Sequence, residues 1–160
     1  MITAHIERLS DTLEELKPRF VPHYRELALD QDRVPLDPMY ELYLEREARG
    51  EVLLSVLRDK GRVVAYFVGF IAPGMHYRTC LTLTMDIFWL DPEYRNEDSL
   101  SKLEAHMLSL QLFESVRDEA RRRGVQRAFF GSKSHSDASA VFEALGAQEV
   151  ERYHSVWWGD

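Results

Sequence analysis

One aspartate stands alone in a long apolar segment, at a position where a carboxylate is able to do chemistry. Residues 79–90 read TCLTLTMDIFWL, and Asp86 is their only charged side chain. An apolar environment raises the pKa of a carboxylate, and such a group can act as a general base directly or through a water molecule. The alternative is a structural role, in which Asp86 accepts hydrogen bonds from a neighbouring strand or loop.

A group of polar residues follows this segment directly. It reads Asp91-Pro92-Glu93-Tyr94-Arg95 and precedes a helical pattern that stops at Gly124. In sheets with helical crossovers, ligands bind at the carboxyl ends of strands. We therefore expect Arg95 to face the mouth of a crevice, with residues 96–99 in an exposed loop. The alternative for Arg95 is a surface ion pair with Glu93 or Glu97, which contributes little stability in water.

Alternation within residues 79–90 predicts a β-strand with two different faces. One face is wholly apolar, and the other mixes polar and apolar residues. The apolar face is predicted to hold Leu81, Leu83, Met85, Ile87 and Trp89. Asp86 then lies on the mixed face.

Residue patterns on either side predict the elements that position this strand. Further strands are predicted over residues 1–8, 51–58, 62–71, 125–130 and 149–158, a helical pair over 11–50, and helices over 100–123 and 137–145. Asp11 and Glu14 have the spacing of a capping box at the start of the first helix. Pro18 and Pro22 predict a kink in that helix or its division in two.

This order predicts an α/β (α+β) protein with a central mixed sheet, mostly antiparallel, and helices on both faces. The helix at 100–123 connects the strands at 79–90 and 125–130, so these two strands should be parallel and splay apart at their carboxyl ends. The chain of 160 residues has the size of one domain, so we expect a single domain over 1–160.

Composition excludes several functional classes. The net charge of −7 disfavours binding of nucleic acid through its phosphates, and no apolar run is long enough for a membrane span or shaped as a secretory signal. A cytoplasmic location is therefore expected. Cys80 is the only cysteine, and the six histidines are scattered, so no metal site is predicted.

Two motifs resemble those of the Gcn5-related N-acetyltransferase (GNAT) family. Leu90-Asp91-Pro92-Glu93-Tyr94-Arg95 is similar to the ending of the family's fourth strand, and residues 138–147, ASAVFEALGA, are similar to a helix near the end of its fold. A looser resemblance, in short segments such as Gly131-Ser132-Lys133, links the chain to GNAT-like proteins of tailed bacteriophages.

The resemblance implies transfer of an acetyl group from acetyl-CoA, as co-substrate, to an amine. It implies Asp86 as general base, and it places the coenzyme against Phe88, Trp89, Leu90, Arg95, Asn96 and Ser99. Phe142 stands where the family has a tyrosine that acts as the general acid, and phenylalanine cannot donate a proton. Tyr153 and His135 are the nearest residues in sequence that could replace it as the acid. Acidic residues in the predicted helical pair favour as acceptor a primary amine on a small cationic molecule or a protein lysine.

The chain departs from the family at the diphosphate-binding loop. Residues 96–100, NEDSL, contain no glycine and two carboxylates where the coenzyme's diphosphate is expected, and residues 105–109 contain no glycine either. The alternative function is therefore a GNAT-shaped protein without acetyl transfer, which serves as a protein-interaction or virion-associated module. Trp157 and Trp158, on the predicted last strand, leave room for a homodimer or another protein partner.

Overall fold

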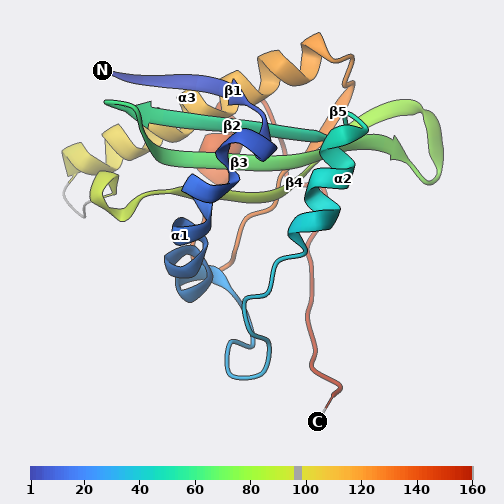
Figure 1. Cartoon of the computed structure of the whole chain (residues 1–160), viewed down its shortest axis with the longest axis horizontal. Coiled ribbons are helices and arrows are strands. Elements are labelled where there is room, and N and C mark those ends of the chain that lie inside the picture. The colour runs from blue at the N-terminus through green and yellow to red at the C-terminus, as the bar shows by residue number, and fades with distance from the viewer. Residues whose placement is uncertain (96–98, 160) are drawn as a thin grey trace.

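Five strands form one mixed sheet in the computed structural model, which describes residues 1–95 and 99–159 (Figure 1). The strands follow their chain order across the sheet: β1 (Ile2–Glu7), β2 (Val52–Asp59), β3 (Arg62–Gly74), β4 (Tyr77–Leu90) and β5 (Arg127–Phe129). Neighbours are antiparallel except β4 and β5, which are parallel. The predicted class, an α+β fold around a mostly antiparallel sheet, is therefore confirmed.

Helices cover both faces of this sheet. The helices are α1 (Leu9–Leu27), α2 (Tyr40–Ala48), α3 (Ser99–Arg122) and α4 (Ser139–Ala144). A short 3-10 turn over Pro92–Tyr94 lies between β4 and α3. One apolar cluster packs α3 and α4 against the sheet, and a second packs α1 and part of α2 against the opposite face. The two clusters give the protein three layers.

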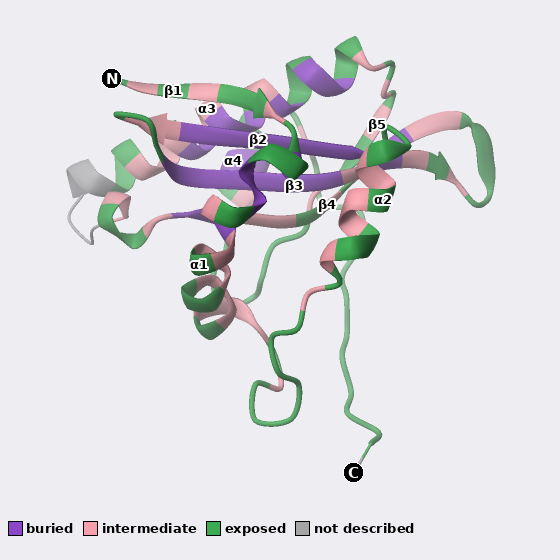
Figure 2. Ribbon diagram, viewed as in Figure 1, coloured by how far each residue is buried: buried purple, intermediate pink, exposed green. Residues whose placement is uncertain are grey.

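The middle of the sheet is the most deeply buried region, as Figure 2 shows for β2 and β3. Residues 63–68 of β3 are all at most 1% exposed. Tyr66 belongs to the cluster under α1, whereas Phe67 belongs to the cluster under α3. This confirms the central position predicted from a strand that is apolar on both faces.

Turn residues explain where the elements end. Lys60 and Gly61 both have positive φ, as a two-residue hairpin turn between β2 and β3 requires. Gly124 has a φ of +85° just after α3, as the sequence predicts for a helix stop.

The start of α1 differs from the prediction. The helix begins at Leu9, two residues before the predicted cap Asp11, and the side chain of its N-cap residue, Arg8, makes no capping hydrogen bond. Instead, the Glu47 carboxylate of α2 accepts hydrogen bonds from the main-chain N–H groups of Leu9 and Ser10. A carboxylate at this end also interacts favourably with the helix dipole. Pro18 and Pro22 both lie within this one helix, so the chain is not divided there.

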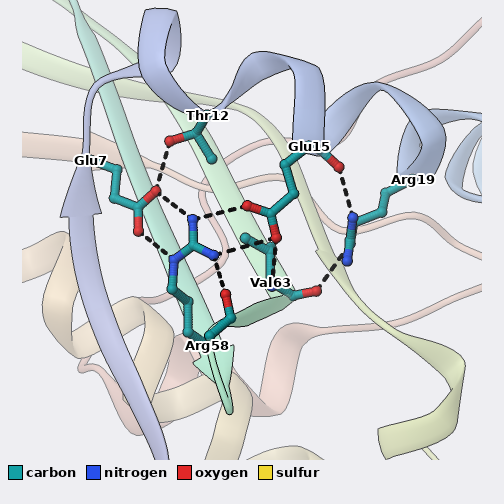
Figure 3. A network of polar contacts seen from close by, with 7 residues as sticks. Glu7, Thr12, Glu15, Arg19, Arg58 and Val63 are labelled. Atoms are coloured by element: carbon teal, nitrogen blue, oxygen red, sulfur yellow. Dashed lines mark hydrogen bonds and ion pairs between the residues drawn. The ribbon is translucent and has the colours of Figure 1, made fainter.

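Polar contacts close the edge where β1, β2 and α1 meet (Figure 3). The guanidinium of Arg58 donates to Glu7 and to Glu15, with its Nε 2.7 Å from a Glu7 oxygen. Thr12 donates to the same Glu7, and Glu15 also accepts from the main-chain N–H of Val63. The hydrogen bond from Arg58 is the main cause that lowers the pKa of the Glu7 carboxyl.

The end of the chain also differs from the prediction. Residues 149–158 were expected to form a strand, but they form no strand in the structure and extend away from the sheet (Figure 1). Their large side chains are mostly in solvent, since Tyr153 is 88% and Trp158 91% exposed. The alternation of polar and apolar side chains predicted that this segment is extended. An alternating pattern does not reveal which strand, if any, the segment pairs with.

Candidate active site

Asp86 lies in a β-bulge of the fourth strand. Val68 of β3 pairs with Ile87, but the next β3 residue, Gly69, pairs with Met85, so Asp86 has no residue opposite it. A bulge of this kind inserts one extra residue, bends the strand and is common beside active sites. The bulge therefore singles out the residue that the sequence also singled out.

The bulge corrects the predicted faces of β4. Before it, Leu81, Leu83 and Met85 pack with the α3 cluster; after it, Phe88 and Leu90 pack there, whereas Ile87 and Trp89 pack under α1. The single apolar face predicted from strict alternation is therefore wrong. One extra residue reverses the orientation of every side chain that follows it.

The pairing of β4 with β5 ends just before the bulge. Thr82 to Thr84 pair with Arg127 to Phe129, and β4 then continues to Leu90 without this neighbour. Both the parallel pairing predicted for these strands and its loss toward their carboxyl ends are confirmed. The unpaired part of β4 offers main-chain N–H and C=O groups to a ligand, directly beside Asp86.

The environment of Asp86 comes mainly from α2. The Tyr43 hydroxyl donates a hydrogen bond to its carboxylate, and the Tyr43 ring lies 5.5 Å from that of Phe70. The guanidinium of Arg46 lies 4.0 Å from the centre of the Phe70 ring and forms an ion pair with Glu51. Asp86 as a whole residue is exposed, but partial desolvation still raises the pKa of its carboxyl, and the hydrogen bond from Tyr43 partly opposes this shift.

A groove of about 570 Å³ lies on the sheet, and its lining extends along β4 to Thr84, two residues before Asp86. Its floor is made by paired residues of β3, β4 and β5, and Arg46 of α2 contributes to a wall. The turn between β3 and β4 closes one end. The lining residues include Phe70, Tyr77, Thr82, Thr84, Arg127 and Phe129.

The residues predicted to bind the coenzyme do not all reach a surface. Trp89 and Leu90 are 4% and 3% exposed, and the Phe88 ring lies 4.8 Å from that of Phe113 in the core. The side chains of Trp89 and Leu90 fill the core, so only their main chain is available to a ligand, whereas Phe88 is half-buried.

Arg95 has a protein partner. Its guanidinium makes two hydrogen bonds to Glu26 of α1, and Glu26 also accepts from the indole N–H of Trp89. The predicted alternative of an ion pair with Glu93 is thus wrong, because Arg95 pairs with Glu26 and Glu93 pairs with Arg62. Glu97, the other predicted partner, lies outside the described residues. Asn96 lies outside the described residues. Ser99 is the first residue of α3.

The predicted proton donors are both exposed, and neither is among the described partners of Asp86. His135 is exposed in the connection between β5 and α4, and Tyr153 lies on the exposed terminal segment. Phe142 is 7% exposed and packs 5.2 Å from Phe113. The structure therefore does not bring Tyr153 or His135 together with the carboxylate.

Several residues of the site could not be recognised from the sequence. Tyr43 showed only the spacing of a helix, and Arg127 is one of many arginines; sheet register and helix packing bring them to the groove. Across the described ranges, no three His, Cys, Asp or Glu side chains gather as metal ligands. Within those same ranges, no helix is both long and apolar enough to cross a membrane.

The mixed five-stranded sheet, its parallel β4–β5 pair and the helices match the GNAT fold. The chain is similar to a GCN5-related N-acetyltransferase from Ralstonia eutropha JMP134, with a TM-score of 0.69, 16% identity and coverage of 99% of this chain and 100% of the other. It is also similar to a ribosomal-protein-alanine N-acetyltransferase from Brucella melitensis biovar Abortus 2308, with a TM-score of 0.68, 14% identity and coverage of 100% and 99%.

A third similar structure is the glucosamine-6-phosphate N-acetyltransferase of Arabidopsis thaliana, with a TM-score of 0.66, 11% identity and 99% coverage of both chains. No protein-family model matches the sequence, and no curated protein matches it. At these identities the likeness establishes the fold, and the activity has to be argued from the site.

Proposed function

We propose that the protein is an N-acetyltransferase that moves an acetyl group from acetyl-CoA to a primary amine. The observation that carries this proposal is the coincidence of three features at one place. Asp86 occupies the bulge, β4 loses its neighbour β5 next to it, and a groove on the sheet is lined by Thr84, two residues before Asp86. Acyltransferases of the same fold support the reaction class.

In the proposed reaction the acceptor amine enters from the groove and attacks the thioester carbonyl carbon. The C–S bond breaks, the new C–N bond forms, and the thiolate leaves with the coenzyme. Asp86 takes the proton that the amine loses, directly or through water, because its raised pKa suits a base. Tyr43 acts as a positioning residue, since its hydrogen bond fixes the carboxylate.

The described residues fit the acyl arm of the coenzyme better than its diphosphate. Unpaired main chain of β4 after Thr84 supplies hydrogen-bonding groups for an extended arm. A similar structure from Clostridium acetobutylicum, a predicted acetyltransferase, contains acetyl-CoA, with a TM-score of 0.61 and 11% identity. The segment 96–109 of this chain contains no glycine, however, and the guanidinium of Arg95 is already bound by Glu26.

That last observation favours a second candidate function. An arginine whose guanidinium already binds a carboxylate is less available to a diphosphate. Glu97 and Asp98 also carry negative charge, which repels a negatively charged diphosphate. In this alternative, the protein keeps the fold and serves as a protein-interaction module. The two candidates differ in whether the native protein binds acetyl-CoA.

Thermal unfolding with and without acetyl-CoA separates them. A ligand that binds only the native state stabilises it by about 2.7 kcal/mol at a hundredfold excess over Kd. An N-acetyltransferase should therefore show a clear rise in Tm. No rise at millimolar acetyl-CoA, in protein that melts cooperatively, would favour the interaction module.

Two matched variants then test the base. Asp86→Asn should keep the rise in Tm with acetyl-CoA but lose most of the transfer to an amine, because the amide keeps the shape and removes the base. Asp118→Asn, on the outer part of α3, should keep both. Full transfer by the Asp86 variant would exclude this residue as the base.

A further inference from the structure

The groove lined by Thr82 and Thr84 of β4 contains an arginine without an acidic partner among the described residues. Arg127 lies at the start of β5, opposite Thr82, and its half-buried side chain enters the groove. Its Nε atom is buried and has no hydrogen-bond partner. A buried donor without a partner is costly, so a site that keeps one has another use for it.

Two aromatic rings hold the guanidinium in place. Its central carbon lies 4.9 Å from the centre of the Tyr77 ring and 5.0 Å from that of Phe129. Contacts of this kind attract a cation and orient its plane without using its hydrogen-bond donors. The N–H groups on the two terminal nitrogens of Arg127 thus stay available for a ligand.

The charge of the groove points to the sign of that ligand. Arg46, His76 and Arg127 line it, and none of the residues around it is acidic. Arg46 is compensated by Glu51 at 3.2 Å, which leaves Arg127 as the uncompensated arginine of the lining. The planar guanidinium suits a carboxylate or a phosphate, to which it can donate two parallel hydrogen bonds.

The sheet sets the distance between Arg127 and Asp86. Thr82, the partner of Arg127, is four residues before Asp86 on β4. At about 3.3 Å per residue, the two positions stand roughly 13 Å apart along the sheet. A linear acceptor about six to eight carbons long spans this distance.

From these observations we propose that the groove selects acceptors that carry an anionic group at the end remote from the reacting amine, with Arg127 as the residue that binds the anion. The inference rests on the proposed function for the identity of the amine end. The ammonium end is drawn toward Asp86 and the exposed Glu41 and Glu45 of α2, and the carboxylate or phosphate end toward Arg127.

Binding measured by calorimetry, without any coenzyme, tests this proposal independently of catalysis. The probes are 6-aminohexanoate, hexylamine and 1,6-diaminohexane, which share one length and differ in the group at the far end. The wild-type protein should bind 6-aminohexanoate at least tenfold more tightly than either of the others. An aminoalkyl phosphonate of equal length shows whether the site prefers a carboxylate or a phosphate-like anion.

Variants assign the preference to Arg127. Arg127→Gln should lose the tenfold preference while its Tm stays within a few degrees of the wild type, and Arg127→Lys should recover part of it. The surface variant Arg117→Gln should bind like the wild type. Equal binding of the three probes by the wild type, tighter binding of the diamine, or an unchanged preference in Arg127→Gln would overturn the proposal.

The same probes separate this proposal from the proposed function. If 6-aminohexanoate binds with the expected preference but is not acetylated, the anion site stands and the transferase proposal fails. If amines are acetylated with no preference for an anionic end, the transferase stands and the anion site fails.

Discussion

His23 shows how one side chain can tie stability to pH. It lies between α1 and the sheet, where its Nδ1 is hydrogen-bonded to the Tyr66 hydroxyl at 2.6 Å and its ring stacks on Trp89. Desolvation is the main cause that lowers its pKa to about 4, although Glu26 acts in the opposite direction. At neutral pH the ring is therefore neutral and its packing is undisturbed.

A depressed pKa makes folding favour the neutral ring. This contribution is complete above the unfolded pKa of 6.5 and is lost as the pH falls toward the folded value of about 4. We expect the free energy of unfolding to fall by roughly 2 kcal/mol more between pH 7 and pH 5 in the wild type than in His23→Gln. Urea unfolding at both pH values measures this.

The exposed His135 supplies the control. His135→Gln should keep the pH dependence of the wild type. If His23→Gln keeps it as well, the ring is not the group responsible.

At this scale, sequence reasoning identified Asp86 but none of its partners. A single charge in an apolar strand is visible in the sequence, whereas the approach of Tyr43, 43 positions away in the chain, depends on how α2 packs on the sheet. Arg95 illustrates the same limit, because its partner Glu26 lies 69 positions away. Charge and spacing predicted that these residues matter, and tertiary packing decides what they touch.

Among the elements, β4 depends on a glycine opposite its bulge. A Cβ atom at Gly69 would lie 2.7 Å from a methyl carbon of Leu83 and 2.8 Å from the Phe67 ring. Gly69→Ala should therefore lower the free energy of unfolding by about 2 kcal/mol, because both neighbours are fully buried and cannot move away cheaply. Denaturant unfolding is the measurement.

Gly131→Ala is the matched substitution, since its new methyl group would meet only Met85, at 4.0 Å. It should change stability by less than about 0.5 kcal/mol. Equal effects of the two substitutions would mean that the close packing at the bulge is absent in solution.

The junction of β1, β2 and α1 makes a second test at this scale. Arg58→Met would leave Glu7 and Glu15 without their guanidinium, and these carboxylates are only 20% and 36% exposed. We expect a loss of about 2 kcal/mol in the free energy of unfolding at pH 7. Because the pKa values of both carboxyls are lowered in the folded state, the loss should shrink as the pH falls below 4.5.

A more exposed ion pair provides the comparison. Arg117 pairs with Asp118 at the surface of α3, with exposed fractions of 45% and 67%. Arg117→Met should cost less than about 0.5 kcal/mol in the same unfolding experiment. A similar loss in both variants would contradict the stabilising role assigned to the partly buried junction of β1, β2 and α1.

In the molecule as a whole, the terminal segment stands apart from the packed layers. Val150, Tyr153 and Val156 are each more than 60% exposed, and Arg33 lies over the Trp157 ring at 5.1 Å. Removal of residues 149–160 should therefore shift Tm by no more than a few degrees, because little apolar area is buried there. A thermal scan of the shortened chain checks this, and a large fall in Tm would show that the segment packs on the sheet.

The overall fold was largely predictable, and the terminal segment was not. Helix stops such as Gly50 and Gly124 and the hairpin glycine Gly61 are local signals, and local signals order the elements correctly. Whether residues 149–158 pair with a strand is a question of distant contacts, which alternation does not answer. The extra residue at Asp86 escaped prediction for a related reason, since only the register with β3 reveals it.

The positions of the three tryptophans give the protein two optical signals. Trp89 is 4% exposed, stacks on His23 and donates to Glu26, whereas Trp157 and Trp158 lie on the terminal segment and are 38% and 91% exposed. A soluble quencher should extinguish the fluorescence of the terminal pair and spare that of Trp89. The residual emission then reports on the packed layer that joins α1 to β4, and the quenched part reports on whatever the end of the chain meets.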